Sequence, residues 1–230
     1  MKELLRYSLI KNKFPREFLL LQGTGCVYKK CSFCDYYNDV SDNPFEVNKP
    51  VIERVTGVTG VLDIINSGSC FELDEKTINL IYEKAVQKNI HTLWFETHYL
   101  YKNKLPEFRE KFPGLKIKFR TGIESFNPKL RVFLNKGIPS NVTVQEVSKY
   151  FDGVCLLVGF VGQSREDVIN DINLACEFFE YASVNVFVEN TTALKQDKSI
   201  VNWFKTEVYP KIKNEPLIEV LLNNTDLGVG

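Results

Sequence analysis

Short apolar segments alternate along this chain with longer amphipathic ones, and the alternation limits the fold more than any other feature. The short segments are rich in β-branched residues and read as strands. Strands that are apolar on both faces occur in parallel sheets covered by helices. The expected strands are 18–22, 61–66, 92–96, 116–120, 154–159 and 184–188, with a terminal candidate at 217–222.

Helical patterns follow most of these strands, so the chain reads as a series of β/α units. We expect helices at 75–88, 106–111, 128–134, 165–181 and 200–209, and a loop over the turn-rich residues 38–50. Six such units are too few to close an eight-stranded barrel. The sequence therefore predicts a single α/β domain over residues 1–230, built as a partial (β/α)6 barrel or as a doubly wound sheet.

Polar residues gather where the expected strands end. In either architecture the chemistry lies at the carboxyl ends of parallel strands, so these residues should share one rim. They are Cys26, Cys31 and Cys34 after the first strand, Ser67-Gly68-Ser69 after the second, Glu96 and His98 after the third, Arg120 and Glu124 around the fourth, 159–163 after the fifth, and Asn190 after the sixth.

The three cysteines of the run GTGCVYKKCSFC suit a metal better than a disulfide. Three thiolates can hold three irons of a [4Fe–4S] cluster and leave the fourth iron open. Structural zinc prefers four ligands in two short pairs, and no second pair exists among the isolated Cys70, Cys155 and Cys176. A thioredoxin-like CxxC would leave Cys26 without a role. The spacing alone favours iron–sulfur and leaves zinc and redox chemistry open.

Bulk properties exclude several classes of function. The formal net charge is zero, which argues against an extended nucleic-acid footprint. No apolar run is long enough to span a bilayer, and the charged N-terminus does not read as a signal peptide. Six cysteines in a chain with no secretion signal indicate a reducing compartment, for which the cytoplasm is the default expectation. Hydrophobic residues make up 44% of the chain, enough for a substantial core.

Residues 16–190 resemble radical S-adenosylmethionine (SAM) enzymes. The cysteine spacing is CxxxxCxxC, one residue longer than the commonest form, and Phe33 precedes the last cysteine as the family prefers. The run NSGSC at 66–70 falls where the family has a GGE-like segment, with Ser69 in place of the acid. GIES at 122–125 and GFVGQSREDV at 159–168 are similar to the family's segments after strands four and five, with Val161 where proline is common.

The resemblance implies a partial-barrel radical SAM core with a [4Fe–4S] cluster on the three cysteines and SAM on the open iron. Reductive cleavage of SAM would give a 5′-deoxyadenosyl radical that takes hydrogen from a small substrate. An electron donor such as a flavodoxin or ferredoxin would supply the electron.

The resemblance also suggests a role for individual residues. Ser67, Gly68 and Ser69 would approach the methionine ammonium, Glu124 the ribose hydroxyls and Lys136 the carboxylate of SAM. Phe33, Gly159, Phe160, Val161 and Gly162 would surround the adenine, and Asn185 or Asn190 would contact adenine or substrate. Glu96 would contact the methionine moiety, and Glu96 and His98 are the catalytic candidates. The substrate candidates are Tyr36, Trp94, Arg120 and Arg131. Arg120, Arg131 and Lys136 are the candidate contacts for a substrate phosphate.

Within this family, the short core and the longer cysteine spacing are most similar to enzymes of deazapurine-nucleoside metabolism. Lyases that release queuine from queuosine or its 5′-phosphate are the nearest example. Two alternatives remain at this stage: an activating enzyme that places a glycyl radical on a partner protein, and a non-catalytic zinc-binding α/β module.

Overall fold

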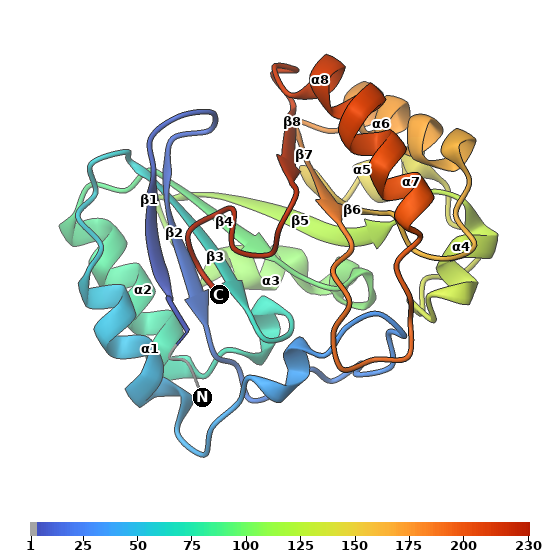
Figure 1. The fold of residues 1–230 in the computed structure, drawn as a ribbon. Coiled ribbons are helices and arrows are strands. Elements are labelled where there is room, and N and C mark those ends of the chain that lie inside the picture. The colour runs from blue at the N-terminus through green and yellow to red at the C-terminus, as the bar shows by residue number, and fades with distance from the viewer. Residues whose placement is uncertain (1–3) are drawn as a thin grey trace. The chain divides into compact units, whose positions relative to one another are not determined.

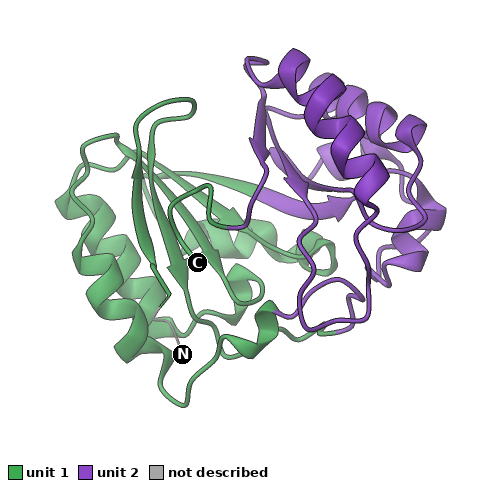
Figure 2. Ribbon diagram, viewed as in Figure 1, with its two compact units in different colours: residues 1–29, 36–119, 225–230 green, residues 30–35, 120–224 purple. Residues whose placement is uncertain are grey.

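The computed structural model describes residues 4–230, which divide into two compact units (Figure 2). Unit 1 contains the residues up to Lys29 together with 36–119 and 225–230. Unit 2 contains residues 30–35 and 120–224. Each unit combines strands with helices that pack on them, and each is described by itself below.

The strands follow one another in sheet order as they do in the chain. Strand β1 pairs antiparallel with β2, whereas β2, β3 and β4 are parallel, and so are β5, β6, β7 and β8. The bounds are β1 (Tyr7–Ile10), β2 (Arg16–Leu21), β3 (Val61–Asn66), β4 (Thr92–Glu96), β5 (Lys116–Glu124), β6 (Gly153–Val158), β7 (Tyr181–Val186) and β8 (Ile218–Leu221). All seven expected strands are present; the antiparallel β1 was not expected.

In unit 1, helices α1 and α2 pack side by side, with α1 against β2 (Figure 1). Asp74 begins α2 by accepting a hydrogen bond from the Thr77 backbone N–H, a side-chain cap that satisfies one helix donor. The helical elements of this unit are η1 (Tyr36–Asn38), α1 (Pro44–Glu53), η2 (Cys70–Glu72), α2 (Glu75–Gln87), η3 (Tyr99–Lys104) and α3 (Leu105–Glu110).

Helix α1 corrects the expectation of a loop over residues 38–50. Asn43, Pro44 and Pro50 gave this segment its turn-like composition. Pro44 stands at the first helical position, where its missing N–H costs nothing and its fixed φ favours the helix. Val51 and Ile52 supply the buried face that holds α1 on unit 1.

In unit 2, helix α6 packs on β6 and β7, and α5 packs on α6 (Figure 1). All six residues of β6 are buried, as expected for a strand covered on both faces. The helices of this unit are α4 (Pro128–Phe133), α5 (Val144–Ser148), α6 (Arg165–Phe178), α7 (Lys198–Trp203) and α8 (Tyr209–Ile212), with a π-helical turn η4 (Phe204–Val208) between the last two. The expected helix at 165–181 ends at Phe178, because Tyr181 begins β7.

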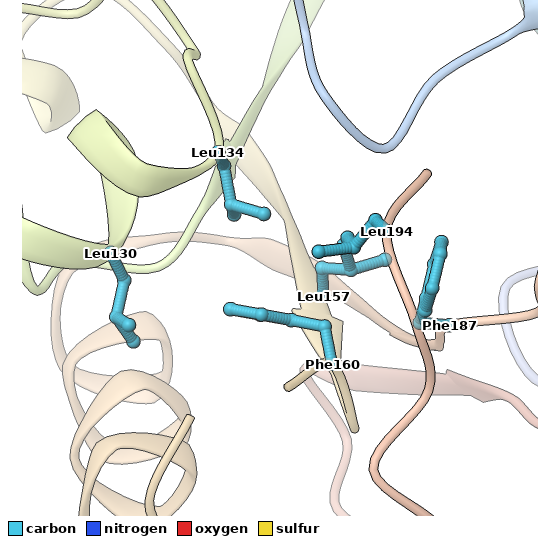
Figure 3. Packing of buried hydrophobic residues seen from close by; sticks show 6 residues of the cluster. All are labelled: Leu130, Leu134, Leu157, Phe160, Phe187 and Leu194. Atoms are coloured by element: carbon cyan, nitrogen blue, oxygen red, sulfur yellow. The ribbon is translucent and has the colours of Figure 1, made fainter. Parts of the chain in front are cut away.

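A cluster of apolar side chains in unit 2 lies at the ends of its strands. Figure 3 shows its members on α4, on β6 and in the segments after β6 and β7. Phe33, from the cysteine loop, packs against this cluster. The members are Leu130, Leu134, Leu157, Phe160, Phe187 and Leu194.

No helix within residues 4–230 is both long enough and apolar enough to cross a membrane.

Candidate active site

In unit 1 the segment that leads to Cys26 is bonded to the turn after β3. The Gly23 N–H donates to Ser67 Oγ at 3.2 Å, and the Thr24 N–H donates to the Glu72 carbonyl at 2.8 Å. A Cβ on Gly23 would stand 2.9 Å from both Asn66 Nδ2 and the Glu72 carbonyl oxygen, so this position requires glycine. The approach to the first cysteine and the Ser67–Ser69 turn therefore form one connected structure.

Glu72 caps the short helix η2 and reaches back to the cysteine loop. Its Oε2 accepts the Ser69 N–H at 2.6 Å, and its Oε1 accepts the Val27 N–H at 2.9 Å. Ser69 and Glu72 form a reciprocal capping box. The carboxylate is buried, and this burial raises its pKa. Tyr101 donates a further bond to Oε1 at 3.3 Å, and the pKa of its phenol rises to about 12 because of burial and the nearby Glu72 charge.

The end of β4 contributes Trp94, Glu96 and His98. The His98 N–H donates to Ser69 Oγ at 3.0 Å, which places β4's end beside the Ser67–Ser69 turn. The His98 ring stacks on Tyr28 of the cysteine loop with centroids 4.7 Å apart. Its Nδ1 accepts the Leu100 N–H at 3.2 Å and so caps η3. Glu96 is half-buried at the last position of β4.

Trp94 and Tyr36, two expected substrate contacts in unit 1, differ in how far they are exposed to solvent. Trp94 is half-buried, and the Lys118 ammonium lies 5.1 Å from its ring centroid. Tyr36 begins η1 two residues after Cys34, and 61% of it is exposed. Both rings have the flat apolar faces that stack on heterocycles, and Tyr36 is the more exposed of the two.

The second part of the cysteine loop, residues 30–35, is anchored within unit 2. The Ser32 N–H donates to the Leu134 carbonyl at 3.0 Å, and Asn190 Nδ2 donates to the Phe33 carbonyl at 2.7 Å. Thr191 donates to Asp35 through both its N–H and its hydroxyl, at 3.0 and 2.8 Å. Asn190, expected to contact adenine or substrate, thus holds the backbone beside Cys34.

Glu124 and Lys136, the two expected SAM contacts in unit 2, form a buried ion pair at 2.9 Å. Glu124 ends β5 beside a register shift and has a φ of +63°, a left-handed conformation rare for residues other than glycine. The Lys136 ammonium also lies 5.4 Å from the Phe33 ring centroid. A Cβ on Gly122 would stand 2.4 Å from Glu124 Oε1, so the pair needs glycine there. The acid, the base and the ring come together although 91 positions separate Phe33 from Glu124 in the sequence.

The turn at 159–163 uses its backbone donors within the chain. The Gly159 N–H, at a φ of +90°, donates to Gln163 Oε1 at 2.8 Å, and the Val161 N–H donates to the Lys195 carbonyl at 3.0 Å. The Phe160 side chain is fully buried in the apolar cluster of Figure 3, whereas Val161 is 47% exposed. Of the side chains expected to surround adenine, Val161 is therefore exposed, whereas Phe160 packs in the apolar core beneath the surface of unit 2.

The two arginines expected at a phosphate are buried in unit 2. The Arg120 guanidinium lies 5.7 Å from the Tyr181 ring centroid. Arg131 is 1% exposed and donates to the carbonyls of Phe126 and Val142, both at 2.9 Å. These contacts give Arg131 a structural role in holding the chain around α4.

The cysteine loop carries donors suited to an iron–sulfur cluster. None of the cysteines in residues 4–230 forms a disulfide, and Cys26, Cys31 and Cys34 are partly exposed, whereas Cys70 and Cys155 are buried. Cys26 Sγ accepts the Lys29 N–H at 3.3 Å. Within residues 4–230, no three His, Cys, Asp or Glu side chains are arranged to hold a metal ion. The fit therefore rests on the soft thiol donors themselves.

The chain is similar to a solved structure over almost its whole length. It is a "queuine lyase from Clostridium spiroforme bound to SAM and queuine", with 40% sequence identity and a TM-score of 0.94. The alignment covers 99% of this chain and 100% of that one. The chain belongs to the queuine lyase family. No protein-family model and no curated protein sequence matches it.

Membership in the queuine lyase family confirms the expected resemblance to radical SAM enzymes and the α/β partial-barrel fold class. Glu72 was not among the expected site residues, because Ser69 stands where the GGE-like segment has its acid. The spacing Ser69-x-x-Glu72 is the capping-box pattern and could have identified it. No signal in the sequence identifies Asn190, Thr191 and Asp35 as anchors, because their partners are more than 150 positions away.

Proposed function

We propose that this chain is a radical SAM lyase that releases queuine from queuosine or queuosine 5′-phosphate. The observation that carries the proposal is the full-length, 40%-identical match to an enzyme bound to SAM and queuine. Residues 1–230 would act as one radical SAM core domain. Thiolate ligands to iron need a reducing compartment, and we propose the cytoplasm.

Cys26, Cys31 and Cys34 would hold a [4Fe–4S] cluster through three of its irons. When bound, the cluster would supply the electron for reductive cleavage of SAM, the chemistry needed for hydrogen abstraction from the substrate ribose. A flavodoxin or ferredoxin is the proposed electron donor. Phe33 packs on the apolar cluster of unit 2 and Asn190 donates to its carbonyl, so contacts within the chain hold this part of the loop.

SAM would meet polar groups that the chain already holds in place. Glu124 would accept from the ribose hydroxyls and Lys136 would donate to the SAM carboxylate. A carboxylate has about four acceptor sites and an ammonium has three donors, so each can bind SAM and keep its bond to the other. Backbone groups of the Ser67–Ser69 turn would approach the methionine ammonium, with Glu96 as a further contact. Gly159, Phe160 and Val161 would shape the adenine site.

The substrate side rests on the residues around the end of β4. Tyr36 and Trp94 offer ring faces for a flat deazapurine, and His98 is held by its stack on Tyr28 and its bond to Ser69. His98 and Glu96 are the residues proposed to hold or move a proton at the substrate. Arg120 stays a proposed phosphate contact, whereas the carbonyl contacts of Arg131 make it the weaker of the two candidates.

The test is turnover by protein reconstituted with iron and sulfide under anaerobic conditions. We expect about four irons and four sulfides per chain, with a broad absorbance near ~400 nm that is lost on reduction. With SAM, dithionite and queuosine or its 5′-monophosphate, mass spectrometry should detect queuine together with 5′-deoxyadenosine. Cys26→Ala, Cys31→Ala and Cys34→Ala should abolish the cluster and the products, whereas Cys155→Ala should retain both.

The outcomes separate the proposal from its alternatives. SAM cleavage that neither nucleoside affects would contradict the lyase function and leave a radical SAM enzyme of another substrate class, such as a glycyl-radical activating enzyme. Stoichiometric zinc without sulfide would favour the zinc-binding module instead. A full cluster in Cys26→Ala would remove that residue from the ligand set.

A further inference from the structure

Glu72 has no role among the cofactor or substrate contacts proposed above, yet its carboxylate accepts hydrogen bonds from three different residues of unit 1. Oε2 accepts from Ser69 and Oε1 from Val27 and Tyr101. Val27 directly follows the first cysteine, and Ser69 ends the turn proposed for the methionine end of SAM. One side chain therefore bonds the backbone of both segments.

Gly68 lies directly against this carboxylate and leaves no room for a side chain of its own. A Cβ on Gly68 would stand 1.9 Å from Glu72 Oε2 and 3.1 Å from the Cys26 Cα. No side chain fits at that point unless both the carboxylate and the cysteine backbone move. Gly68 therefore brings the turn, the acid and the first cysteine into direct contact.

The main chain of Glu72 adds to the same connection. Its carbonyl accepts from the Thr24 N–H at 2.8 Å and from the Thr24 hydroxyl at 3.2 Å. Glu72 thus contacts the cysteine loop on both sides of Cys26, through its backbone before it and its side chain after it. An ordinary helix cap would serve only its own helix, as Asp74 does for α2 through Thr77.

We propose that Glu72 is the positioning residue for Cys26: it fixes the backbone of the first cluster ligand against the Ser67–Ser69 turn. The inference rests on the proposed function for the identity of the cluster, but its contacts belong to the chain alone. The chemistry explains why an acid is needed. Two backbone N–H groups from different segments converge on it, and a carboxylate accepts through both oxygens, whereas an amide can accept through only one.

The first experiment uses the full chain without a cluster and compares Glu72→Ala, Glu72→Gln and wild type by hydrogen exchange. The Val27 amide and the peptide covering residues 23–31 should exchange at least about tenfold faster in Glu72→Ala, the factor expected from losing a charge-assisted bond. Glu72→Gln keeps one acceptor and should be intermediate. Asp74→Ala is the matched control: it removes a capping carboxylate two residues away and should leave exchange at 23–31 unchanged.

The second experiment measures the reconstituted protein. Iron release to a chelator should be about tenfold faster in Glu72→Ala than in wild type, and SAM should bind more weakly, whereas Asp74→Ala should match wild type in both. Gly68→Ala should behave like Glu72→Ala. Because the two residues act on the same contact, the double variant should lose less than the sum of the single losses.

The results separate this inference from the proposed function. Wild-type exchange at 23–31 and wild-type iron release in Glu72→Ala would overturn the positioning role, as would equal effects in Asp74→Ala. If wild-type protein builds no cluster while Glu72→Ala still loosens residues 23–31, the proposed function is wrong and the role of Glu72 in holding the loop stands.

Discussion

At the scale of single residues, Glu124 combines two costly features. Its backbone is left-handed, and its carboxylate is buried against the Lys136 ammonium. Strained conformations of this kind persist where the surrounding structure fixes them and often occur at functional sites. Burying an ion pair is seldom a gain in stability over apolar side chains of the same size. Both features are consistent with a residue kept for ligand binding.

Glu124→Gln should weaken SAM binding about tenfold or more and leave the cluster in place. The change removes charge-assisted hydrogen bonds, which contribute about 1.5–3 kcal/mol each. Calorimetric titration of reconstituted protein with SAM measures the dissociation constant. Glu177→Gln, which removes an exposed charge from α6, is the control and should bind SAM like wild type. An unaltered dissociation constant in Glu124→Gln would exclude the proposed ribose contact.

At the scale of elements, α4 is held by an arginine that serves the backbone. Arg131 lies within this six-residue helix, too short to be stable by itself in water. Its guanidinium bonds the Phe126 carbonyl before the helix and the Val142 carbonyl after it. The side chain thereby fixes both flanks of the helix that carries Leu130 into the apolar cluster.

Arg131→Met should lower the free energy of unfolding by about 3–5 kcal/mol, because two buried carbonyls lose charged donors. Arg131→Lys should fall between this variant and wild type, since an ammonium lacks the planar fork that reaches both carbonyls. Lys129→Met, on the exposed side of the same helix, should change stability by less than about 0.5 kcal/mol. Urea unfolding measures all three, and a loss below about 1 kcal/mol in Arg131→Met would refute the structural role.

The sequence predicts elements best where one physical cause dominates. The fully buried β6 was predicted because both of its faces are apolar. Helix α1 was missed because the prolines that start and interrupt it also read as turn residues. At the candidate site, the contacts between residues could not be predicted. Asn190 and Phe33 meet only through the fold, and the burial of Phe160 in the apolar cluster depends on how unit 2 packs.

At the scale of the whole molecule, one buried acid connects stability to pH. Asp171 on α6 is buried and accepts the Phe126 N–H at 2.7 Å. Burial raises its pKa from 3.8 to about 7. The folded state therefore keeps a proton on Asp171 that the unfolded chain releases at lower pH. Stability therefore falls as pH rises from about 4 to 7, because unfolding releases this proton over that range, and it stays at the lower level above pH 7.

Asp171→Asn should remove this part of the pH dependence. Relative to wild type, the variant should gain stability as pH increases from about 4 to 7 and hold the gain above, because asparagine carries no charge to bury. Unfolding free energies measured by urea titration between these pH values give the comparison. Asp167→Asn on the same helix is a suitable contrast, since the pKa of that acid is lowered by its bond with Ser164. Parallel stability curves for wild type and Asp171→Asn would contradict the assignment.

The close packing of Gly68 against Glu72 has a consequence for protein engineering. A nine-residue peptide copied from 26–34 would carry the thiols to a new scaffold. It would lack Glu72, which accepts the Val27 N–H, and Gly68, which leaves room for the Glu72 carboxylate. The transferable module is discontinuous: residues 23–31 together with 66–72, with the glycine and the glutamate retained as a pair. Grafts that include both segments should hold the first thiol in place, and grafts of the cysteine segment alone should leave it mobile.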